Sequence, residues 1–139
     1  MESILLPGFA LAAVTFFVWC RLPFERLGQM KRARIHPQAV ATSAQMAARL
    51  QDTRAADNLR NLFELPVLFY FALLAAAQTG QGGGLLLGLA WAFVALRALH
   101  SLIHCGYNRV QHRFVVYVLG AACLWALLAA LALRLLRLA

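Results

Sequence analysis

The chain alternates between long apolar runs and shorter polar stretches. Four apolar runs lie at about residues 4–22, 57–78, 84–107 and 113–134. A helix of about 20 apolar residues crosses the roughly 30 Å hydrocarbon core of a bilayer. The pattern therefore predicts an all-α protein, an integral membrane four-helix bundle, with residues 1–139 forming one domain.

The polar connections between these runs differ in length. One long basic connection covers about residues 23–56, and its Ala-rich part, residues 38–54, favours partial helix. Residues 78–84 form a short glycine-rich turn, and residues 108–113 form a short polar link. Tight links join antiparallel neighbours, so the spacing predicts an up-down-up-down order.

The first apolar run is expected to be a retained span. No basic region precedes it, and Arg21, Leu22 and Pro23 follow it where a signal peptide would carry small residues for cleavage.

Composition agrees with lipid as the solvent. The 139 residues are 63% hydrophobic and 13% charged, whereas soluble domains are about 45–50% apolar and about 25% charged. The three cysteines form no close pair, so no disulfide framework is expected.

The net charge of +8 is concentrated in the connections. Eight of the 13 Lys and Arg residues lie between Arg21 and Arg60, which places the long basic connection in the cytoplasm by the positive-inside rule. Arg134 and Arg137, at the chain end, weigh against that orientation. No basic stripe with exposed aromatic residues occurs, so nucleic acid is not an expected partner.

The third apolar run contains a stripe of polar side chains. Arg97, His100, His104 and Tyr107 are three, four and three residues apart, which places them on one helical face. An arginine at the bilayer centre costs at least about 2.5 kcal/mol on insertion scales. This stripe is therefore expected to face other helices or a water-filled cavity.

The second run begins with a similar polar face. Asp57, Arg60, Asn61 and Glu64 share this spacing, and Arg60 and Glu64 are one turn apart, so they can neutralise each other. Both faces lie at the cytoplasmic ends of their spans and are expected to meet. They favour a site for a polar, anionic ligand, although polar contacts also hold membrane helices together without any ligand.

Two segments resemble the motifs of the MAPEG family, the membrane-associated proteins of eicosanoid and glutathione metabolism. Arg-Asn-Leu-Phe-Glu-Leu-Pro at residues 60–66 is similar to the second-helix motif. Arg-Ala-Leu-His-Ser-Leu-Ile-His at residues 97–104, followed by Arg113, is similar to the third-helix motif. The resemblance covers nearly the whole chain and is strongest to small bacterial members. It implies a homotrimer in a membrane, here the bacterial inner membrane, in contact with lipid.

The resemblance also implies a binding site for glutathione, as co-substrate, between neighbouring subunits. Arg113 matches the arginine that stabilises the glutathione thiolate, and a nearby cation does favour a thiolate over a thiol. The residues expected to bind or support glutathione are Asn61, Glu64, Arg60, Arg97, His100, His104 and Tyr107.

The sequence departs from the family pattern at two positions. His104 stands where characterised enzymes carry a tyrosine, and Asp57 stands where some carry an arginine. The first-helix arginine of the site can be Arg21 or Arg26.

Three functions remain open from the sequence. The first is a glutathione-dependent transferase or peroxidase that acts on hydrophobic electrophiles or lipid hydroperoxides. The second is a non-catalytic membrane protein of the same scaffold that binds a lipid or a partner protein. The third is a metal or haem site built on His100 and His104, for which no third ligand is evident; the candidates are Cys105, Glu64 and His112.

Overall fold

The chain folds into helices that build four spans. The computed structural model describes residues 4–137, and these contain no strand. Its elements, in chain order, are α1 (Leu6–Ala33), the 3₁₀ helix η2 (Pro37–Val40), α2 (Ser43–Arg49), α3 (Arg54–Asn61), α4 (Leu65–Gln78), α5 (Leu85–Cys105) and α6 (Val110–Leu136). Helix α1, α3 and α4 taken together, α5 and α6 are each long and apolar enough to cross a membrane. The prediction of an all-α integral membrane protein is thereby confirmed.

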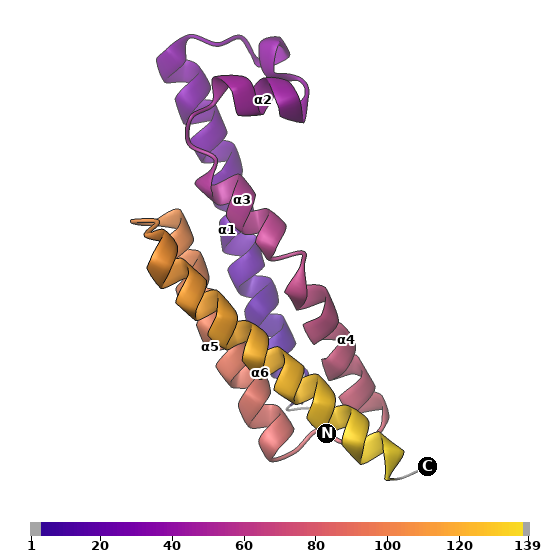
Figure 1. Ribbon diagram of the computed structural model, residues 1–139. Coiled ribbons are helices and arrows are strands. Elements are labelled where there is room, and N and C mark those ends of the chain that lie inside the picture. Colours follow the sequence, from indigo (N-terminus) through magenta and orange to yellow (C-terminus); the bar gives the residue numbers. More distant parts are fainter. Residues whose placement is uncertain (1–3, 138–139) are drawn as a thin grey trace.

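Successive spans run antiparallel, so that α1 is parallel to α5 and the span of α3 and α4 is parallel to α6 (Figure 1). Both chain ends lie at one end of the bundle, and the long connection with η2 and α2 lies at the opposite end, which we call the loop end. Helices α5 and α6 pack as a hairpin; α1 packs on α3 and α5, and α4 packs on α6.

Helix α1 extends well beyond the first apolar run. It continues past Leu22 through Pro23 to Ala33, because a single proline removes only one helical hydrogen bond and the residues that follow are good helix formers. It ends at Arg34, whose left-handed backbone (φ 52°) lets its N–H bond the carbonyl oxygens of the last turn. Much of the connection over residues 23–56 is therefore helical.

The second span is broken between α3 and α4. Pro66, at the start of α4, has no N–H to donate to the carbonyl of Leu62, and its ring crowds that carbonyl. Residues 62–64 form turns instead of helix. The expected continuous polar face from Asp57 to Glu64 is therefore wrong: Glu64 lies in the break, outside both helices.

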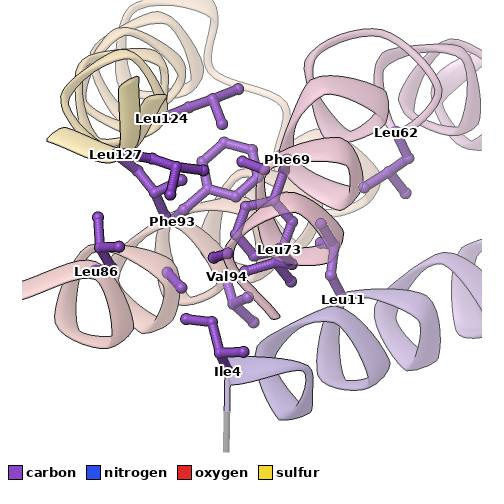
Figure 2. Packing of buried hydrophobic residues seen from close by; sticks show 14 of the residues in the cluster. Ile4, Leu11, Leu62, Phe69, Leu73, Leu86, Phe93, Val94, Leu124 and Leu127 are labelled. Carbon is purple, nitrogen blue, oxygen red and sulfur yellow. The ribbon is translucent and has the colours of Figure 1, made fainter. Parts of the chain in front are cut away.

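Buried apolar side chains of all four spans form one core, whose packing Figure 2 shows. Phe69 of α4 and Phe93 of α5 have ring centres 4.6 Å apart, and Leu124 and Leu127 of α6 pack around them. The outer faces instead expose large apolar side chains such as Phe17. Such faces are expected where lipid or another subunit covers them.

Arginines fix the loop end of α5. The last carbonyl groups of a helix lack intrahelical donors. Arg21 of α1 donates to the carbonyl of Cys105 (2.9 Å), and Arg54 of α3 donates to that of Gly106. These bonds hold the end of α5 level with the start of α3.

Candidate functional site

Arg97 is buried in the interior of the bundle. Its residue surface is only 2% exposed, and its guanidinium carbon lies 5.0 Å from the ring centre of Tyr117 and 5.5 Å from that of Phe93. Both distances are typical of cation–π contacts. None of its three guanidinium nitrogens has a hydrogen-bond partner among the described residues. The fold therefore buries a cation and its donors without an acceptor.

Two histidines continue this stripe toward the loop end. His100 and His104 are each 3% exposed, and their rings meet edge to face with centres 5.5 Å apart. Nδ1 of His100 lies 3.3 Å from the backbone oxygen of Arg113. Nε2 of His100 and Nδ1 of His104 are buried and, within residues 4–137, have no partner. Together with Arg97, they leave several unsatisfied polar atoms in one stripe.

Tyr107 does not belong to this stripe. Helix α5 ends at Cys105, and Gly106 takes a backbone conformation (φ −94°, ψ −116°) outside the helical region. The spacing of three residues after His104 consequently no longer describes a helical face. Tyr107 is 64% exposed, and its hydroxyl lies 3.0 Å from Nδ1 of His112. The expectation that it shares a helical face with Arg97 is wrong.

Arg113 begins α6 beside the histidines. Its side chain is half-buried and donates to Oδ1 of Asn108 at 2.7 Å. Asn108 has a left-handed backbone (φ 50°), a conformation that asparagine tolerates better than most residues. The turn between α5 and α6 therefore holds Arg113 near the loop end of the stripe, where its backbone oxygen meets His100.

The predicted residues of the second span form an outer group. Arg60 is exposed and forms an ion pair of 3.8 Å with Asp57, not with Glu64 as the spacing suggested. Asn61 is half-buried, and Glu64 is exposed at the break. The structure thus divides the candidate residues into an inner group (Arg97, His100, His104) and an outer group (Arg60, Asn61, Glu64).

The two groups lie at similar depth. Arg54 contacts Gly106, so the start of α3 and the end of α5 are level. Leu62 and Arg97 are each about 12 Å from that level along their own helices, given a rise of 1.5 Å per residue. No ion pair within 4 Å joins Glu64 to Arg97 in the described part of the chain.

Two further residues of this region were not predicted. Tyr117 lies against both Arg97 and His100, with its ring centre 5.8 Å from that of His100. Its position one helical turn after Arg113 was the available signal. Asn58, fully buried on α3, accepts from Ser101 (3.3 Å) and donates to the sulfur of Cys105 (3.4 Å). The sequence signal for Asn58 was its position one helical turn after Arg54, on the face of α3 that meets α5.

A metal site receives no support from the geometry. Within residues 4–137, no group of three or more His, Cys, Asp or Glu side chains is placed to hold an ion. His100 and His104 are adjacent, but the structure does not bring Cys105, Glu64 or His112 to them as a third ligand. The arrangement suits an anionic, hydrogen-bonding organic ligand better, because its unsatisfied groups include a fixed cation.

Comparison with known proteins assigns the family. No curated protein and no solved structure matches the chain. The sequence matches the MAPEG family over residues 4–133, which is almost its full length. Members of this family share a membrane scaffold of glutathione-related transferase and peroxidase type and are generally oligomeric. This four-span chain, with its polar stripe at the loop end, belongs to the MAPEG family.

Proposed function

We propose that the protein is a membrane glutathione-dependent transferase or peroxidase that acts on hydrophobic electrophiles or lipid hydroperoxides. The observation that carries this proposal is the buried Arg97, whose donors have no acceptor. A buried cation without a counter-charge costs several kcal/mol. A ligand carboxylate would offset that cost, and glutathione carries two carboxylates.

Each candidate residue has its own role in binding glutathione. Arg97 and Arg60 attract carboxylates, Asn61 offers both donors and an acceptor, and Glu64 accepts from the ammonium group. His100 and His104 supply ring nitrogens along the inner stripe. Tyr107 lies at the surface, and among the residues expected from the sequence to bind glutathione it has the weakest geometric support.

Arg113 is the proposed catalytic residue. A thiol with a pKa of about 8.5 is mostly protonated at neutral pH, and a guanidinium beside the sulfur stabilises the thiolate. The thiolate then attacks the electrophilic carbon and forms the carbon–sulfur bond as the leaving group departs. To reach the sulfur, Arg113 has to release or share the oxygen of Asn108.

An apolar groove offers a path for the second substrate. It lies between α1 and α5, has a volume of about 510 Å³, and is lined by apolar side chains such as Val14, Phe17 and Leu102. Its loop end reaches Arg21, Ser101 and Cys105. A hydrophobic substrate dissolved in the bilayer can therefore approach the polar end of α5 without crossing water.

The outer group supports assembly as a homotrimer with the site between subunits. Arg60 and Glu64 lie on the outer surface of the single chain, at a depth where lipid would leave charges unsolvated. A neighbouring copy would cover them and bring them to a ligand. The charge bias of the long connection supports a cytoplasmic position of the loop end, and the resemblance to small bacterial family members favours the bacterial inner membrane.

A non-catalytic role is the second candidate. Asp57 already neutralises Arg60, and Asn108 already binds Arg113, so two of the proposed ligand-binding cations have partners within the chain. The same scaffold could then hold a lipid or a partner protein.

Conjugation of glutathione to a chlorodinitrobenzene separates the two candidates. We expect measurable turnover that Arg113→Ala reduces at least tenfold. Arg109→Ala, which removes an exposed arginine from the same turn, should retain it. Absence of turnover in the folded wild-type protein, together with absence of glutathione binding by calorimetry, would favour the non-catalytic role.

A further inference from the structure

A group of basic side chains at the loop end has no counterpart in the proposed function. Lys31, Arg32 and Arg34 are exposed at the end of α1, and Arg49 is exposed at the end of α2. We call these four residues the basic rim.

Acidic side chains do not neutralise the basic rim. The carboxylates near it have other partners: Glu25 pairs with Arg21, Asp52 with Arg54, and Asp57 with Arg60. No ion pair of the described chain includes a residue of the rim. The rim therefore presents uncompensated positive charge.

The rim also has a shape that suits a headgroup. A hollow of about 310 Å³ lies between α1 and the end of α2, with Arg32 on one wall and Arg49 on the other. Gln29 and Gln51 line the same hollow. Gln29 is fixed by two bonds to the backbone of Asp52, one donated (2.8 Å) and one accepted (2.9 Å). The hollow thus has a rigid wall and two guanidinium groups that can face one anion.

The rim stands just outside the headgroup layer. Below it on α1, Phe24 and Leu27 are 76% and 58% exposed, as expected of side chains that meet the edge of the bilayer. Arg32 follows the apolar run by about ten residues, or about 15 Å along the helix. Side chains on a helix tilt toward its N-terminus, which here is toward the membrane. The headgroup layer is about 5–8 Å thick on each side, so the backbone of the rim lies beyond it by less than about one Debye length, and the long arginine side chains reach back toward the phosphates.

We propose that the hollow between α1 and α2 binds the phosphate headgroup of an anionic phospholipid. Arg32 and Arg49 hold the phosphate from two sides, while Phe24 and Leu27, closer to the bilayer, lie in the headgroup layer. Guanidinium groups bind phosphate with paired hydrogen bonds. The bound lipid fastens the long connection, with α2, to the membrane surface; this role does not depend on glutathione.

Native mass spectrometry of the full protein in mixed micelles tests this proposal. The two lipids to compare are a phosphatidylglycerol and a phosphatidylcholine with the same acyl chains. We expect preferential retention of phosphatidylglycerol. The double variant Arg32→Gln/Arg49→Gln should bind it about 30-fold more weakly, because each basic residue near a membrane contributes about 1 kcal/mol, or about fivefold.

The matched control is Arg134→Gln/Arg137→Gln, which removes the same charge from the opposite end of the bundle and should retain wild-type preference. The single variants Arg32→Gln and Arg49→Gln, each expected to lose about fivefold, provide the test if the double variant does not fold. Equal retention of the two lipids, or equal losses in the rim and control variants, would overturn the proposal. Displacement of the lipid by millimolar inorganic phosphate would show a site for free anions and would overturn it as well.

Discussion

Arg97 is the residue whose environment most needs an explanation. Burial removes its charge from water, which costs free energy. Cation–π contacts with the rings of Phe93 and Tyr117 offset only about 1–2 kcal/mol of that cost. The absence of an acceptor for its donors, within the described chain, means that the ligand-free fold carries a cost at this position. Buried, perturbed ionisable groups of this kind cluster at functional sites.

Replacement of Arg97 by methionine tests this interpretation. Arg97→Met should raise the thermal stability of the ligand-free protein by on the order of 1 kcal/mol, because it removes an unpaired buried charge and keeps much of the side-chain volume. It should also weaken glutathione binding at least tenfold. Thermal unfolding in detergent and calorimetry measure the two effects, with Arg109→Met as the control. A destabilised variant with normal glutathione affinity would mean that Arg97 is structural.

The pairing of Asp52 with Arg54 predicts how the stability of the fold depends on pH. Two hydrogen bonds from the Arg54 side chain lower the pKa of Asp52 from 3.8 to about 2. A lowered pKa in the folded state stabilises the protein above the unfolded value of 3.8, and this contribution is lost as the pH falls toward 2. Because Asp52 is partly exposed, solvent screening limits the contribution to about 1 kcal/mol.

Thermal unfolding of Asp52→Asn across pH measures that contribution. The variant should be less stable than the wild type at pH 7, and the difference should shrink between about pH 4 and pH 2. Asp57→Asn, whose ion pair with Arg60 is longer and more exposed, should show a smaller difference at pH 7. A difference for Asp52→Asn that stays constant down to pH 2 would contradict the assigned pairing.

At the scale of single residues, the sequence predicted part of the site. Helical spacing placed Arg97, His100 and His104 on one face, and all three are buried there. Spacing could not reveal that Gly106 ends the helix before Tyr107, because glycine is permitted in either state. Nor could it show that Tyr117 covers Arg97, because that contact depends on how α5 and α6 pack.

At the scale of elements, the break between α3 and α4 sets the position of Glu64. The break follows from Pro66 and not from the residues around it, which would otherwise continue a helix. Placing Glu64 in a turn takes it off the faces of both helices. The break therefore takes Glu64 off the helix that carries Arg60 and Asn61.

Pro66→Ala should join the two helices. Alanine restores the N–H that the carbonyl of Leu62 lacks, so hydrogen exchange at residues 62–65 should slow. Glutathione binding should weaken because Glu64 moves. Pro23→Ala in α1, where the helix already continues through the proline, should leave exchange at residues 62–65 unchanged. Unaltered exchange in Pro66→Ala would show that tertiary packing, and not the proline, causes the break.

The elements themselves were largely predictable. Hydropathy located the four spans, because only apolar segments of this length can cross a bilayer. The extension of α1 to Ala33 was not visible, since its residues are polar and hydropathy does not report helix in polar segments. The capping box of Thr42 and Gln45 at the start of α2 was a readable local signal for part of the long connection.

At the scale of the whole molecule, the single chain leaves charged residues of the outer group uncovered. We expect a trimer in mild detergent, measured as protein mass by light scattering. Glu64→Lys should weaken it, because a reversed charge in a buried interface leaves its neighbours unpaired. Lys31→Glu, a reversal on the exposed end of α1, is the control. A stable monomer that still binds glutathione would contradict the intersubunit site.

The most direct test of glutathione activation is the ultraviolet absorbance of the glutathione thiolate in the presence of the purified protein at pH 7. We expect a thiolate signal with the wild type and with Arg109→Ala, and its loss with Arg113→Ala in a protein that remains folded. Absence of the signal with the wild type, or its persistence in Arg113→Ala, would contradict the claim that this protein activates glutathione through Arg113.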